Sequence, residues 1–165
     1  MRLLLVPLLA AVLAAGCDRA GPAPPPEPPT APSGVTGSAA AGGCKASYEE
    51  PDALSPSYRP GAPVREVVGQ GHLLTGTVRS GRDCAPVAGA RVELWPEIAG
   101  QGHPDSQRAT VLTAADGSYR FQSDLPEHIH MLVSADGFEP LASNRYHPEG
   151  SASGRFDIVL TPARS

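Results

Sequence analysis

The sequence lacks the features that define several common protein classes. Its 13 Lys and Arg residues are outnumbered by 17 Asp and Glu and form no basic cluster, so nucleic acid is not expected as a partner. No C-x-x-C motif occurs, which removes the commonest redox and zinc signatures. Gly69-Gln70-Gly71 lacks the third glycine of a dinucleotide loop, and Ala152 stands where a nucleophile elbow requires serine. No stretch shows sustained helical periodicity.

The apolar run near the N-terminus is too short to span a bilayer as a mature helix. Leu3 to Leu13 follows a basic residue and precedes the small residues Ala14-Ala15-Gly16, an order that predicts a signal peptide over residues 1–16. The residues before Cys17 resemble the lipobox of bacterial lipoproteins, with the leucine one place further upstream than usual. We expect an exported protein, anchored in a bacterial membrane by lipid on Cys17 and facing the periplasm or cell exterior. Ordinary secretion is the alternative.

The next segment, residues 17–43, begins with Cys17 and is dominated by proline, followed by a Gly/Ala/Ser tract. Such a composition buries too little apolar surface to offset the entropy of ordering, and it predicts a disordered tether. Residues 44–165 remain, and their number suits one domain of ordinary size.

Only Cys44 and Cys84 remain once Cys17 is assigned to lipid. In an oxidising exported compartment these two cysteines are expected to form one disulfide. The alternative is a pair of buried free thiols.

The domain contains short runs rich in β-branched and aromatic residues, which predict strands over 72–79, 90–95, 108–113, 118–122, 128–135 and 155–160. Several runs alternate, as where Val92 and Leu94 are interleaved with charged residues. Asp-Gly turn signals at 115–118 and 135–138 predict hairpins. The regular spacing indicates an all-β fold, a β-sandwich of roughly seven short strands.

Two histidines one residue apart are the strongest chemical signal. On a strand, His128 and His130 point away from Ile129 and lie roughly 6–7 Å apart, close enough to bind one metal ion at about 2.1 Å. A pair of surface or half-buried histidines is the plainer interpretation. We expect His72 and His147 at exposed loop or strand-end positions, with His147 a candidate for the mouth of the site.

Several motifs occur in an order typical of one family. They are Ser57 to Arg65, Leu74-Thr75-Gly76-Thr77-Val78, Asp83 to Trp95, Thr113 to Phe121, and Pro126-Glu127-His128-Ile129-His130. Together they resemble the intradiol ring-cleavage dioxygenases, the catechol and protocatechuate dioxygenase family. Transthyretin-like and carboxypeptidase-regulatory-like sandwiches share several of these patterns. The tryptophan and the H-I-H in this order favour the dioxygenases.

The resemblance implies a metal site. In that family two tyrosines and two histidines hold a ferric ion, and the catechol is oxidised while bound to it. His128 and His130 match the histidines, whereas the position of the first tyrosine is His103 here. The second tyrosine's stretch is missing, and Leu125 replaces the substrate-contacting arginine. The implied ligands are His103, His128 and His130, and Tyr146 or Tyr119 could supply the missing phenolate.

Three neutral imidazoles would leave the charge of Fe³⁺ uncompensated and favour a divalent ion such as Fe²⁺, Cu²⁺ or Zn²⁺. The resemblance itself implies non-haem iron as Fe³⁺. We therefore expect an exported, lipid-anchored, intradiol dioxygenase-like protein that binds a non-haem metal. Its implied activity is oxidative ring cleavage of a small catechol-type aromatic diol. The alternative is a non-catalytic transthyretin-like or carboxypeptidase-regulatory-like binding or spacer module.

Overall fold

The structure, a computed structural model, describes residues 44–47 and 54–164. All of them belong to one compact unit, Gly37–Ser165. The predicted signal peptide, the lipidation site at Cys17 and nearly all of the predicted tether lie outside the described residues. Within the described part of the chain, no helix has the length and apolar character needed to cross a membrane.

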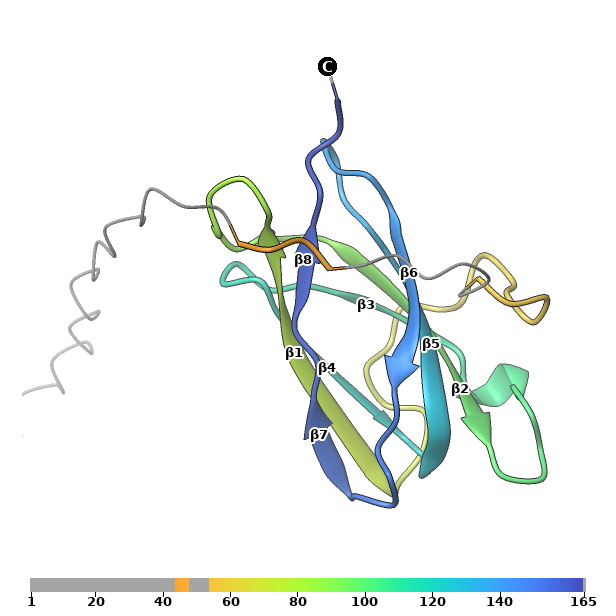
Figure 1. The fold of residues 1–165 in the computed structure, drawn as a ribbon. Helices are drawn as coiled ribbons and strands as arrows, with labels where there is room; N and C mark the ends of the chain where they lie inside the picture. Colours follow the sequence, from red (N-terminus) through yellow and green to blue (C-terminus); the bar gives the residue numbers. More distant parts are fainter. Residues whose placement is uncertain (1–43, 48–53, 165) are drawn as a thin grey trace, which may run out of the picture. The chain divides into compact units, whose positions relative to one another are not determined.

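The described residues form a β-sandwich, which confirms the predicted fold class (Figure 1). One sheet has the order β4-β1-β7, and β8 also pairs with β1. The other sheet has the order β3-β2-β5-β6. A single turn of 3₁₀-helix, η1 (Asp105–Gln107), precedes β3. The strands are β1 (His72–Ser80), β2 (Arg91–Ile98), β3 (Ala109–Leu112), β4 (Ser118–Ser123), β5 (Pro126–Ser134), β6 (Leu141–Tyr146), β7 (Ser153–Arg155) and β8 (Ile158–Leu160).

The hydrophobic core lies between the two sheets because alternate residues of each strand point inward. Leu74 of β1 and Phe121 of β4 meet there with Val92 and Leu94 of β2. Ile129 contributes from β5, and its side chain is fully buried. The alternation in the sequence therefore identifies the core face of β2 and β5 correctly, and it leaves the histidines of β5 on the outer face of their sheet.

Two parts of the strand prediction differ from the structure. β6 was not predicted, because Leu-Ala-Ser-Asn-Arg-Tyr is poor in β-branched residues; it forms by pairing with β5. The predicted strand 155–160 is divided into β7 and β8, both parallel to β1. At the break, the Asp157 carboxylate accepts hydrogen bonds from the Thr77 backbone N–H and hydroxyl. A side-chain oxygen thus replaces a backbone acceptor.

The two Asp-Gly turns have different roles. The turn at 135–138 connects β5 to β6, which pair antiparallel, and is a hairpin as predicted. The turn at 115–118 is not a hairpin: β3 pairs with β2 in one sheet, and β4 pairs with β1 in the other. Turn chemistry specifies a tight reversal of the chain, whereas the choice of partner strand depends on packing between the sheets.

The segment before β1 runs along the edge of the sheet that contains β2 and covers part of its outer face. Val64 pairs with Thr110 of the edge strand β3, and the Arg65 guanidinium donates to the backbone carbonyl of Arg108 at 2.8 Å. The Tyr58 ring covers Trp95 and its hydroxyl donates to Glu93. Because of this cover, two outward-facing residues of β2, Glu93 and Trp95, are buried.

The structure contains the Cys44–Cys84 disulfide that the sequence predicts. Cys84 lies in the loop between β1 and β2, so the bond fastens the start of the domain to one end of the sandwich. The register of β2 with β5 pairs Arg91 with Ser134 near this end and Glu97 with His128 at the other. The disulfide and the two histidines of β5 are therefore at opposite ends of the sandwich.

Candidate metal site

β5 places two histidines side by side on the outer face of its sheet. His128 is paired across the ladder with Glu97 of β2, and His130 is paired with Trp95. Ile129, between them, points into the core. The Nε2 atoms of His128 and His130 are 2.9 Å apart, and the predicted convergence of the two imidazoles is therefore present.

The loop after β2 brings a third histidine to the same place. Ile98 bridges back to Gly102, and Gly100 and Gly102 have φ values of 72° and 65°, a conformation that glycine adopts without steric cost. The tight return directs His103 over β5, with its ring centroid 5.0 Å from that of His130. One ligand atom from each of the three histidines lies within 4.8 Å of the other two.

The geometry of this three-histidine cluster, His103, His128 and His130, fits a metal ion. Two nitrogens bound at about 2.1 Å with a right angle between them are about 3.0 Å apart, close to the 2.9 Å between the Nε2 atoms of His128 and His130. The Nδ1 atom of His103 is buried without a hydrogen-bond partner among the described residues. Such an atom costs about 1–3 kcal/mol, and coordination through Nδ1 would remove that cost.

Neighbouring side chains surround the rings of the cluster. Trp95 stacks on His130, with ring centroids 5.6 Å apart and planes within 5°. On its other side, Trp95 is covered by Tyr58. His128 lies between the carboxylate of Glu97 and the exposed ring of His147. The sequence predicted His147 as a candidate for the site mouth, and its ring centroid is 5.4 Å from that of His128.

The two tyrosines considered as additional ligands are not part of the cluster. Tyr146 is opposite Ile129 in the ladder and belongs to the core, where its hydroxyl donates to Nε2 of His72 at 2.7 Å. Tyr119 donates to the Phe156 carbonyl. Burial raises the pKa of both phenols. The expectation that His72 is exposed was also wrong, because it bridges Tyr146 to the Ser151 carbonyl inside the fold.

In the metal-free protein, stability should fall as the pH falls below about 6.5. Burial lowers the pKa of His128 from its ordinary 6.5; Glu97 opposes the shift, and His147 and His103 add to it. Folding therefore favours the neutral ring of His128. Its contribution to the free energy of unfolding is fully present above the pKa of His128 in the unfolded chain, and it is lost as the pH falls through the lower pKa of the folded protein. Urea unfolding in the presence of chelator, from pH 7.5 to 5, measures how the free energy of unfolding changes with pH. His128→Gln should make this dependence weaker, and an equal dependence in that variant would show that His128 does not cause it.

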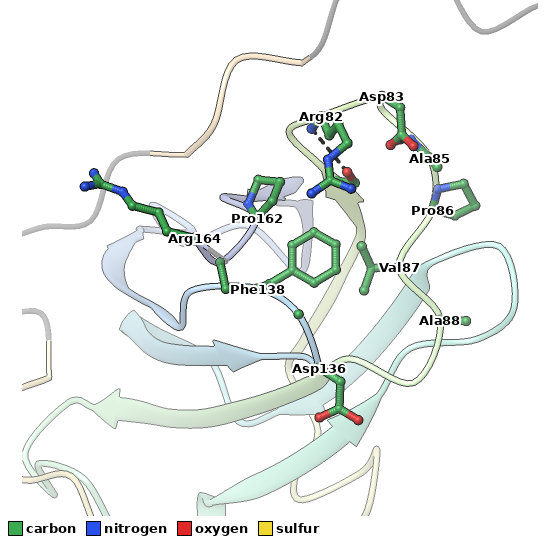
Figure 2. A pocket seen from close by; sticks show the side chains of 13 residues that line it. Arg82, Asp83, Ala85, Pro86, Val87, Ala88, Asp136, Phe138, Pro162 and Arg164 are labelled. Carbon is green, nitrogen blue, oxygen red and sulfur yellow. Dashed lines mark hydrogen bonds between the residues drawn. The ribbon is translucent and has the colours of Figure 1, made fainter.

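A separate pocket of about 750 Å³ lies at the disulfide end of the sandwich. It is lined by the loop after β1, the β5–β6 turn and the C-terminal segment. Figure 2 shows the Phe138 ring beside Pro162 in its centre, with Arg82 above. None of the three clustered histidines lines it. The pocket and the three-histidine cluster are therefore separate sites at opposite ends of the sandwich.

The family of this chain follows from its sequence. The sequence model of the carboxypeptidase regulatory-like domain family matches residues 74–162, more than half of the chain, and the chain belongs to this family. The motifs in the sequence favoured the intradiol dioxygenases and left such a module as the alternative. A search of curated proteins finds no match.

Among solved structures, the sandwich is similar to intradiol-type dioxygenases. The dioxygenase domain of a dioxygenase carbohydrate-binding protein fusion from Streptomyces sp. SirexAA-E aligns with a TM-score of 0.61 at 22% identity, over 72% of this chain and 100% of that one. Hydroxyquinol 1,2-dioxygenase from Pseudomonas putida DLL-E4 aligns with a TM-score of 0.59 at 15% identity, over 73% of this chain and 67% of that one. 3-Chlorocatechol 1,2-dioxygenase from Rhodococcus opacus 1CP aligns at 0.57 with 14% identity, over 73% of each chain. At these identities the likeness concerns the fold.

Proposed function

We propose that this protein is an exported metal-binding protein in which His103, His128 and His130 hold one divalent ion. The observation that carries the proposal is the convergence of three imidazoles from a strand and a returning loop, with ligand atoms within 4.8 Å of one another. Export is supported by the Cys44–Cys84 disulfide, which is typical of extracytoplasmic proteins.

The donor set favours a divalent ion over Fe³⁺. All three ligands are neutral when they bind, and the carboxylate of Glu97 contacts Nδ1 of His128 and is not one of the clustered ligand groups. Imidazole suits Fe²⁺, Cu²⁺ and Zn²⁺. Three protein ligands leave coordination positions open, which is the arrangement of catalytic rather than structural sites.

The substrate that we propose is a small aromatic diol of the catechol type, and the reaction is its oxidative ring cleavage by O₂. Support comes from the similarity of the fold to dioxygenases named for hydroxyquinol and 3-chlorocatechol, together with the open positions described above. In this proposal His103, His128 and His130 would hold the ion at the edge of the sandwich, and the ion would supply open positions for the oxygens of a diol.

A second candidate is a non-catalytic binding or spacer module. Membership of the carboxypeptidase regulatory-like family favours it, and the pocket around Phe138 at the disulfide end gives it a place to bind a ligand. This candidate does not need the three-histidine cluster to bind metal.

Metal analysis separates the two functions. The domain is expressed without a histidine tag, stripped with chelator, titrated with Zn²⁺, Fe²⁺ or Cu²⁺, and analysed after desalting. We expect about one ion per chain, followed by formation of a ring-opened product from catechol by the iron form in air. Absence of bound metal would reject the first function. Bound metal without ring opening would retain the metal site and reject the dioxygenase reaction.

Lipidation of Cys17 after cleavage of residues 1–16 is part of the proposal, with residues 17–43 as the tether of a domain over 44–165. Stretched polyproline at about 3.1 Å per residue would hold the domain tens of ångströms from the membrane. Cys17→Ser should move the protein from the membrane fraction to the soluble fraction. Intact-mass measurement checks the lipid, and a wild-type protein of unmodified mass would refute the anchor.

A further inference from the structure

Glu97 and His128 are direct partners in the ladder between β2 and β5. Oε2 of Glu97 is 3.2 Å from Nδ1 of His128, and the two side chains are 33% and 20% exposed. The other ring nitrogen, Nε2, faces Nε2 of His130 at 2.9 Å. The two nitrogens of His128 therefore have different neighbours, a carboxylate on one side and the three-histidine cluster on the other.

This difference selects one tautomer of the neutral ring. A carboxylate can only accept a hydrogen bond, so the proton of His128 is most stable on Nδ1. Nε2 then carries the lone pair, directed at the cluster. A carboxylate on the distal nitrogen also raises the basicity of a histidine ligand and fixes its ring orientation.

We propose that Glu97 is the positioning residue of the metal site, holding His128 in the tautomer that binds the ion through Nε2. This inference rests on the proposed metal-binding function and adds a residue that the sequence motifs do not identify. Glu93 also carries an outward-facing carboxylate on β2, but it cannot take over this role. Its carboxylate accepts hydrogen bonds from Tyr58 and Arg91.

The chain offers a matched control for the charge of Glu97. Glu127 precedes His128, is exposed and acts on it electrostatically. Glu127→Gln and Glu97→Gln each remove one negative charge near the site, and each keeps the size of the side chain. Only Glu97→Gln removes the carboxylate at Nδ1, so the comparison separates a local hydrogen bond from a general Coulombic effect.

The test uses two readouts on the wild type and both variants. The first is the dissociation constant for Zn²⁺, measured by competition with a chromophoric chelator. Glu97→Gln should weaken binding about 10- to 100-fold, and Glu127→Gln should change it less than about threefold. The second readout needs no metal: ¹⁵N NMR of the imidazoles should show His128 as the Nδ1–H tautomer in the wild type and a mixture in Glu97→Gln. Thermal unfolding of the metal-free proteins checks that the fold is unchanged.

The outcomes for Glu97 and for the metal site are distinguishable. Equal zinc affinity in the wild type and Glu97→Gln, or equal losses in both variants, would overturn the role of Glu97 while leaving the metal site intact. An Nε2–H tautomer of His128 in the metal-free wild type would also overturn it. A wild type that binds no Zn²⁺, Fe²⁺ or Cu²⁺ would remove the proposed function and the positioning role together.

Discussion

His128→Ala and His130→Ala should each reduce the metal content from about one ion per chain to a small fraction, with affinity lowered by roughly 100-fold or more. Each substitution removes one of three ligand atoms that lie within 4.8 Å of one another. The remaining imidazoles cannot supply enough donors for the ion. Metal analysis after desalting, together with chelator competition, measures the loss.

His147→Ala is the control for this pair of substitutions. His147 is exposed and its ring lies beside His128, but it is not one of the three clustered histidines, so its removal should leave the metal content unchanged. His103→Ala tests the loop. Full metal content in His103→Ala would reduce the site to His128 and His130, and full content in His128→Ala or His130→Ala would end the proposal.

Removing the disulfide with the double substitution Cys44→Ser/Cys84→Ser should lower the free energy of unfolding by about 4 kcal/mol. The bond closes a loop across a sequence separation of 40 residues, and the chain-entropy estimate for such a loop is of this size. The substitution of both cysteines avoids leaving a free thiol. Urea unfolding of the variant and wild type at the same pH gives the difference.

The same double variant should bind metal as tightly as the wild type, because the disulfide and the three-histidine cluster are at opposite ends of the sandwich. Reduced wild type should behave like the variant in urea. A loss of less than about 1 kcal/mol would mean that the denatured chain is not constrained by the bond as the entropy model requires. A loss of metal affinity would show that the two ends are coupled.

Local patterns in the sequence were sufficient for the strands that alternate clearly. Val92 and Leu94 define the core face of β2, and Ile129 defines that of β5, because side chains on a strand point to opposite faces in turn. The same rule placed His128 and His130 together. β6 escaped prediction since its sequence has little preference for a strand, and its conformation depends on the hydrogen bonds offered by the neighbouring β5.

The position of His103 came from the family resemblance rather than from periodicity. A loop histidine carries no local signal for where its ring points, and only the return of the chain at Gly102 brings it to β5. Glu97 was missed for a related reason. The spacing of Trp95 and Glu97 matches that of His130 and His128, but the match has meaning only when the register between β2 and β5 is known.

The sequence by itself determined the all-β class, the faces of the main strands and the cysteine pair, because these depend on side-chain periodicity and composition. Its motif order favoured the intradiol dioxygenases and left the carboxypeptidase regulatory-like domain, the family that the sequence model matches, as the alternative. The tertiary structure decided which strands pair, where the phenols of Tyr119 and Tyr146 are buried, and which groups surround the three histidines. Those features are set by contacts between residues far apart in the chain, whose energies depend on register and packing rather than on local sequence.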